Sequence, residues 1–171
     1  MSRTNLAHGN APDRGFEFLD TPVHPQAAAL HDFWLKKCAG RAMPARSDID
    51  LGELRRWAPN IVISEPVNAG ADYRLRLFGS ALVEITGEER TGKLVSEIGS
   101  SGLLAAGNIR ARWRAILSRA FETHAPVFAR ARASVEGREH VLYHGLALPL
   151  SVNGTPAAQC LGALFTEYRS A

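Results

Sequence analysis

Five stretches in the second part of the chain have the residue pattern of β-strands, through alternation of apolar and polar residues or through a high content of β-branched residues. We expect strands over residues 60–67, 73–77, 127–135, 140–150 and 158–168. In the second stretch Tyr73, Leu75 and Leu77 alternate with Arg74 and Arg76. Side chains point to opposite faces at successive strand positions, so one face of this strand is predicted to be buried and the other wet.

Two amphipathic helices are predicted by apolar residues that recur three and four positions apart. The first follows Pro25 and ends at Gly40, with a stripe formed by Leu30, Phe33, Trp34 and Cys38. The second follows Asn108 and ends before Pro126, with a stripe formed by Ile109, Trp113, Ile116, Leu117, Ala120 and Phe121. Shorter helical turns are expected over residues 51–57, 81–85 and 92–107.

Turn signals and composition divide the chain into three parts. Asn153-Gly154 is the strongest hairpin signal, since both residues readily adopt positive φ. Residues 1–20 lack periodicity and are rich in Asn, Gly, Asp, Arg and Pro, so we expect them to be disordered. Residues 21–58 are predicted to form the N-terminal helix and an extended cap segment, and residues 59–171 the core domain.

Composition and charge are those of a single globular domain. The chain has 171 residues, of which 46% are hydrophobic and 22% charged. We expect a cytoplasmic protein, because there is no secretory signal, no apolar stretch long enough to cross a bilayer and only two cysteines. Residues 110–138 carry seven arginines and two glutamates, a local net charge of +5 (7 − 2). This basic face could attract nucleic acid, phosphates or an acidic partner, but a solvated surface is the simpler interpretation.

The order of these elements resembles that of PAS domains, an α+β fold. There, five antiparallel strands lie in the spatial order 2-1-5-4-3 with the helices on one face. The chain is more closely similar to a group of bacterial stand-alone PAS-like proteins, over residues 26–168. The matching residues are Phe33-Trp34, Pro44-Ala45-Arg46-Ser47-Asp48-Ile49-Asp50, Pro59-Asn60, Tyr73-Arg74-Leu75-Arg76-Leu77-Phe78-Gly79-Ser80, Glu84, Gly87, Thr91, Gly92 and Pro126-Val127. One departure is His124-Ala125-Pro126, where a glycine is expected before the proline.

The resemblance implies that a small ligand, where one is present, sits between the inner sheet face and the connecting helices. We expect the pocket to be lined by Tyr73, Leu75, Leu77, Trp113, Ile116, Leu117, Tyr143 and Leu164. Apolar side chains with a few polar tips suit a small organic ligand. The same residues could instead simply fill a core.

No cofactor is identified by the sequence, and neither haem nor flavin is expected. Haem needs an axial ligand on the helix over the sheet, whereas His124 lies at the end of that helix and His140 and His144 lie in a strand. A flavin photoreceptor needs a reactive cysteine between strands two and three, whereas Cys38 precedes the sheet and Cys160 is in the last strand. No metal-ligand spacing is present either.

The segment from Arg76 to Gly79 is the element most similar to the family pattern. In a structural interpretation Gly79 permits a sharp exit from the strand, and Arg76 pairs with Asp48 or Asp50. In a functional interpretation the arginine is a switch that links the N-terminal segment to the sheet. The arginines of strands two and three could also flank the N-terminal helix if that helix lies across the outer face of the sheet.

The leading functional hypothesis is a sensory or regulatory module, not an enzyme, that docks to an unidentified signalling protein and could bind a small ligand. We expect a homodimer through the N-terminal helix, with Leu30, Phe33 and Trp34 at the interface. The alternative is a small cone-like α+β enzyme, of the isomerase or dehydratase type, that uses His144 and Tyr143. Nucleic-acid binding through Arg110, Arg112, Arg114 and Arg119 has no supporting motif.

Overall fold

A computed structural model of the chain describes residues 15–99, 106–133 and 137–170, and side chains within these ranges except those of residues 106–108. The strands are β1 (Phe16–Leu19), β2 (Ile61–Val67), β3 (Asp72–Phe78), β4 (Val127–Arg132), β5 (Val141–Val152) and β6 (Thr155–Tyr168). The helices are α1 (Pro25–Cys38), α2 (Ser80–Thr86) and α3 (Ala106–Thr123). Short 3-10 turns occupy Arg46–Asp48, Ala58–Asn60, Asn68–Gly70 and Val95–Glu97. The predicted helix over residues 51–57 is a series of turns instead.

The strands form one antiparallel sheet in the order β1-β4-β5-β6-β2-β3. This order contains the predicted arrangement of five strands and adds a sixth strand at the edge beside β4. The added strand corrects the prediction that residues 1–20 are disordered, since Phe16–Leu19 pairs with β4 in register from Phe16 opposite Ala131 to Leu19 opposite Phe128. Residues 1–14 lie outside the described part of the chain.

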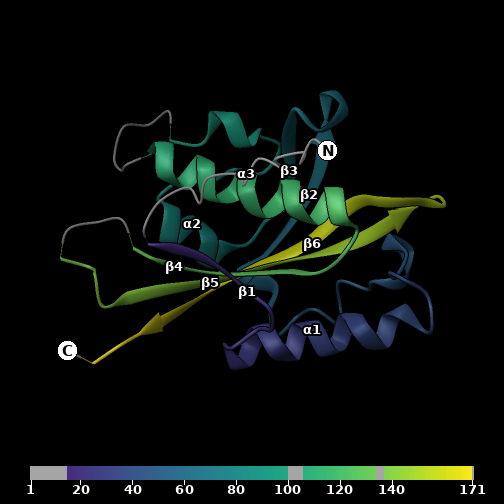
Figure 1. Cartoon of the computed structure of the whole chain (residues 1–171), viewed down its shortest axis with the longest axis horizontal. Helices are drawn as coiled ribbons and strands as arrows, with labels where there is room; N and C mark the ends of the chain where they lie inside the picture. The colour runs from purple at the N-terminus through teal and green to yellow at the C-terminus, as the bar shows by residue number, and fades with distance from the viewer. Residues whose placement is uncertain (1–14, 100–105, 134–136, 171) are drawn as a thin grey trace, which may run out of the picture.

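Helices cover both faces of the sheet (Figure 1). We call the face under α1 the outer face and the face under α2 and α3 the inner face. The N-terminal helix therefore lies across the outer face of its own sheet, one of the two positions that the sequence left open. A buried apolar cluster joins α1 to β5 and β6, with large side chains such as Leu148, Leu150 and Leu161 fully buried.

The apolar stripe of α1 is used within the monomer. Leu30 is 0% exposed and Trp34 is 2% exposed, and the indole Nε1–H of Trp34 donates to the carbonyl of Pro149 at 2.9 Å. Phe33 is half-buried and packs against Trp57, with 5.7 Å between the ring centroids. The prediction that Leu30, Phe33 and Trp34 form a dimer interface is therefore wrong for Leu30 and Trp34, because the sheet already covers them.

A β-bulge in β3 moves one predicted residue to the other face. Ile63 lies opposite Leu77 and Ser64 lies opposite Leu75, so Arg76 is an extra residue that has no partner position in β2. An extra residue reverses the alternation of side chains beyond it. Leu77 consequently packs against the outer-face cluster, whereas Leu75 belongs to the inner-face cluster.

The turn between β5 and β6 has the predicted backbone geometry, and α3 ends without the glycine expected before Pro126. Asn153 and Gly154 both have positive φ, 49° and 80°, and join β5 to β6. At the end of α3, His124 adopts φ 54° and its amide donates to the carbonyl of Ala120 at 3.0 Å. His124 therefore takes the left-handed position that ends helices and that glycine more commonly occupies.

Candidate functional site

A cavity of about 370 Å³ lies between the inner sheet face and helices α2 and α3. Its floor consists of small residues on neighbouring strands: Ala129, Ala131, Ala133, Gly145, Ala147 and Gly162. Side chains this short do not reach the helix above, so space is left where a folded core would normally be filled. A methyl group would fit at Gly145, because an added Cβ would lie 3.5 Å from Ile116 Cδ1, an ordinary contact distance.

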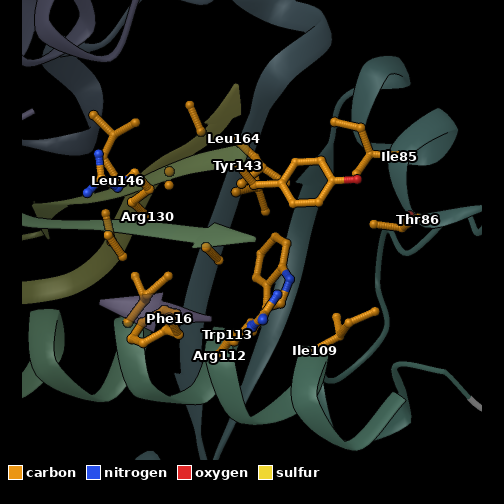
Figure 2. Close-up of a pocket in the computed structure, with 18 of the residues that line it drawn as sticks. Phe16, Ile85, Thr86, Ile109, Arg112, Trp113, Arg130, Tyr143, Leu146 and Leu164 are labelled. Atoms are coloured by element: carbon orange, nitrogen blue, oxygen red, sulfur yellow. The ribbon is translucent and has the colours of Figure 1, made fainter. Parts of the chain in front are cut away.

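Aromatic and aliphatic side chains form the walls (Figure 2). Trp113 and Ile109 come from α3, Phe16 comes from β1, and Tyr143 rises from β5. Figure 2 shows the ring of Tyr143 directed toward α2, with its hydroxyl near Ile85 and Thr86. The added strand β1 thus contributes to the site as well as to the sheet.

The cavity lining includes five of the eight residues predicted for it: Trp113, Ile116, Leu117, Tyr143 and Leu164. The other three lie elsewhere. Tyr73 is buried in the inner-face cluster, stacked on Phe121 at 5.4 Å, and its hydroxyl lies 2.8 Å from Ser118 Oγ. Leu75 is 0% exposed in the same cluster, and Leu77 packs toward the outer face. The core interpretation is therefore correct for Tyr73 and Leu75.

Ser64 is a lining residue that sequence reasoning missed. It is 1% exposed, and its hydroxyl has no hydrogen-bond partner in the described part of the chain. In β2 it lies opposite Leu75 on one side and Cys160 on the other, and both of those residues are fully buried. An unpaired buried hydroxyl costs about 1–3 kcal/mol, so a polar group next to Ser64 would be favoured.

Three arginines and one carboxylate border the cavity: Arg112, Arg130, Arg138 and Glu84. The side chain of Arg130 points to the outer face of the sheet, where it lies opposite His144, so its charge is not directed into the cavity. Arg130 forms an ion pair with Glu17 of β1, and Arg112 donates to the carbonyl of Arg132 at 2.8 Å. Glu84 and Arg138 are exposed and also line a second, open hollow between α2 and the ends of β5 and β6. The cavity therefore opens to solvent at this end, where Glu84 and Arg138 carry opposite charges.

The basic residues of α3 have partners within the chain. They hold the helix to four different segments: Arg110 to Ile98 O at 3.3 Å, Arg112 to Arg132 O, Arg114 to Ala71 O at 2.6 Å, and Arg119 over the ring of Phe18 at 4.4 Å. These contacts give the arginines a structural role in anchoring α3 over the cavity. Nucleic-acid binding gains no support from them.

The predicted pairing of Arg76 is wrong. Arg76 Nε lies 3.0 Å from Glu65 Oε1 on the adjacent strand, while Asp48 pairs with Arg41 and Asp50 accepts from the amide of Gly52. The side chain of Arg76 is 57% exposed, and within the described residues its ion pair is with Glu65 of β2 and not with the segment that precedes the sheet.

Gly79 has a structural role at the exit of β3. A Cβ at this position would lie 2.2 Å from the carbonyl oxygen of Pro59, closer than real contacts allow. The amide of Gly79 donates to the carbonyl of Ile61 at 2.9 Å, which holds the two segments together. The role of Gly79 is therefore structural, but its reason is the close approach of the two backbones and not the sharp exit from the strand that was predicted.

The two residues of the enzyme alternative lie on opposite faces of the sheet. Tyr143 lines the cavity, whereas His144 is 2% exposed beneath α1 on the outer face. A carboxylate does contact His144, since Glu167 Oε2 lies 2.6 Å from its Nε2. Neither His144 nor Glu167 reaches the cavity, so this pair cannot act together with Tyr143 on one substrate.

The histidines and cysteines considered for cofactors are outside the cavity lining in the described part of the chain. Cys38 lies in the outer-face cluster, and Cys160 is fully buried in β6, where burial raises the pKa of its thiol. His124 is at the end of α3, and His140 borders only the open hollow. Among the described residues, no group of three or more His, Cys, Asp or Glu is arranged to hold a metal ion.

An antiparallel sheet crossed by a long connecting helix, with a cavity between them, places the chain in the class of α+β domains that carry their helices over an antiparallel sheet. The sequence model of the PAS domain matches residues 23–165, and the chain belongs to the PAS domain family. The matched region includes α1, which the sequence analysis set apart from the core domain. Family membership supports a sensory or regulatory role, and PAS domains are typically not enzymes.

A solved structure with a similar fold is that of an RNA-binding Light-Oxygen-Voltage receptor. It is 14% identical to this chain, covers 71% of it and gives a TM-score of 0.45, and the chain spans 35% of that receptor. No curated protein matches the sequence. None of the helices in the described ranges is both long enough and apolar enough to span a membrane.

Proposed function

We propose that this PAS domain binds a small organic ligand in the cavity beneath α3 and reports it by docking to a signalling protein. One observation carries the proposal: a cavity of about 370 Å³ contains the buried, unpaired hydroxyl of Ser64. The volume lies within the range of about 300–1,000 Å³ that is usual for ligand pockets. Apolar walls with a few polar groups are also what such pockets contain.

The lining favours a ligand with an apolar, flat body and polar atoms at its ends. Small residues on the sheet and the indole of Trp113 leave a space between two layers, which suits a ring system. The hydroxyl of Ser64 would meet a polar atom at the enclosed end. Arg138 at the open end would attract an acidic group, since arginine binds carboxylates well.

Docking would use the exposed face of α1. Leu35 of α1 is 49% exposed, unlike Leu30 and Trp34 on the buried face. A homodimer remains a prediction, and its interface would involve Leu35. Leu35→Glu should convert such a dimer to a monomer without unfolding the chain, as measured by light scattering and circular dichroism. A dimer that survives the change would place the interface elsewhere.

The ligand proposal is tested with anilinonaphthalene sulfonate, a flat aromatic anion whose fluorescence rises in apolar sites. We expect saturable binding to the native chain and a loss of at least about tenfold in affinity in Ala131→Leu, because the larger side chain fills the cavity floor. Ala71→Leu makes the same change at an exposed position and is the matched control. Equal binding by both variants would show that the probe binds outside the cavity.

A further inference from the structure

The buried face of α1 carries two histidines as well as its apolar stripe. His24 caps the helix and His31 lies seven residues later, close to two helical turns, and both imidazoles are half-buried and face the sheet, against Phe165 and Phe128 respectively. The ring of His31 lies 4.9 Å from that of Phe128 on β4 and 6.2 Å from that of Trp34. Apolar contacts between a helix and a sheet do not respond to pH, whereas these two imidazoles can take up protons.

The contacts of His24 require its neutral form. Its Nδ1 accepts a hydrogen bond from the amide of Gln26 at 3.2 Å, which caps the first turn of α1. A protonated imidazole has a hydrogen on both nitrogens and cannot accept this bond. The ring also stacks on Phe165 with an interplanar angle of 5° and lies 5.2 Å from the ring of His144.

Charged side chains on the neighbouring strands lie close to the rings of His24 and His144. On β6, Glu167 accepts from Nε2 of His144 and also pairs with Arg169. On β4, Arg130 lies opposite His144 in register and pairs with Glu17 of β1. The second nitrogen of His144, Nδ1, is buried without a partner in the described part of the chain, so the site has no acceptor in place for another proton there.

While α1 is docked on the sheet, the protonated forms of His24 and His31 are disfavoured. Burial, and next the charge of His144, hold the pKa of His24 below its ordinary value of 6.5, against the opposing effects of Glu167 and a backbone hydrogen bond at Thr166. Burial likewise lowers the pKa of His31, with Asp32 acting in the opposite direction.

We propose that α1 is a proton-sensitive clasp: protonation of His24 and His31 in weakly acidic conditions weakens the attachment of the helix to the outer face and increases the population in which it is released. This second input to the domain is independent of the ligand cavity, which lies on the other side of the sheet. Release would expose the apolar outer face and free the helix that we expect to take part in docking.

The direction of the pH effect follows from proton linkage. Well above pH 6.5 the imidazoles are neutral whether α1 is docked or free, so protons do not affect docking. As the pH falls through 6.5, the free helix binds protons that the docked helix does not, and release becomes favoured. At about pH 5.5 the opening equilibrium should rise by up to about tenfold for each imidazole.

Hydrogen exchange of the whole chain tests the clasp. We expect protection factors in α1, corrected for intrinsic exchange, to fall by about tenfold to a hundredfold between pH 7.5 and 5.5, while those in α3 change little. The double variant His24→Asn with His31→Gln should lose this pH dependence. Asparagine is a good helix cap that does not titrate, so the helix should remain docked. His140→Asn changes an exposed histidine outside α1 and is the control, which should respond as the native chain does.

Two results would overturn the clasp. One is an unchanged pH response in the double variant, and the other is an equal loss of protection in α1 and α3 of the native chain. If the double variant is poorly folded, His24→Asn alone decides the question, because removal of one titrating group should reduce the pH response by up to about tenfold.

Discussion

The two faces of the sheet are built differently although they share the same strands. The outer face presents large side chains such as Leu148, Leu150 and Phe165 to α1, and the contact is filled. The inner face presents alanine and glycine to α3 at the matching positions, for example Ala147 and Gly145, and the contact is partly hollow. The outer face is thus packed beneath α1, whereas the inner face combines a packed cluster around Tyr73 and Leu75 with a cavity.

This difference arises from strict alternation along each strand. In β5, Leu146 and Leu148 point outward while Gly145 and Ala147 point inward. Burial of large apolar side chains contributes about 1.5–3 kcal/mol for each residue, so the positions of the outer face supply stability that the alanine and glycine positions beneath the cavity lack. A binding site can be kept on a sheet when the opposite face carries the packing.

Tryptophan substitutions should give the largest contrast between the faces. Trp34→Ala should lower the free energy of unfolding by about 3–5 kcal/mol, because the side chain is buried and its hydrogen bond to Pro149 is lost. Trp113→Ala should cost roughly half as much, since the indole already borders space. Urea denaturation measures both values, and a larger loss for Trp113 would contradict the assignment of the faces.

Glycine substitutions should distinguish tight positions from open ones. Gly79→Ala should destabilise the fold by about 1–3 kcal/mol or more, because its Cβ would clash with the carbonyl of Pro59. Gly145→Ala should change the stability by less than about 1 kcal/mol, since the cavity floor has room for a methyl group. Similar losses for the two variants in a thermal melt would show that the inner face is packed.

Removal of the buried hydroxyl should have opposite effects on stability and on ligand binding. Ser64→Ala should leave the ligand-free chain equally stable, or more stable by up to about 1–3 kcal/mol, because an unpaired polar group is removed. A ligand that pairs with this hydroxyl should bind less tightly. Ser47→Ala, at an exposed serine, is the control. A marked destabilisation by Ser64→Ala in urea would mean that the hydroxyl is already paired in the native chain.

The smallest effect is expected at the edge of the sheet. Arg76→Ala should change the stability by less than about 1 kcal/mol, since exposed ion pairs such as Arg76 with Glu65 contribute little. Binding of anilinonaphthalene sulfonate should not change. Loss of probe binding in this variant would restore the idea that Arg76 is a switch.

The sequence predicts much of the fold because its local signals agree with one another. Periodicity identifies α1 and α3, and Asn153-Gly154 marks the hairpin between the last two strands. The strand order follows from the resemblance to PAS domains and is confirmed over five strands. Within the candidate site, helical spacing identifies Trp113, whereas the alternation of the second strand points to Tyr73, Leu75 and Leu77, which lie outside the cavity lining.

The features that were missed depend on tertiary contacts with weak local signals. The bulge at Arg76 shifts Leu77 to the other face, and nothing in the alternating sequence indicates an extra residue there. The four residues of β1 form a strand only because β4 offers a free edge. Ser64 lies in an apolar strand, where its lack of a partner depends on neighbours from β3 and β6.

Native mass spectrometry of the freshly purified chain, with Ala131→Leu and a denatured control alongside, tests the ligand cavity most directly. We predict that the native chain carries an additional non-covalent mass of a small organic molecule, and that Ala131→Leu and the denatured control do not. The bare chain mass for the native protein, or the same added mass on Ala131→Leu, would contradict a ligand site beneath α3.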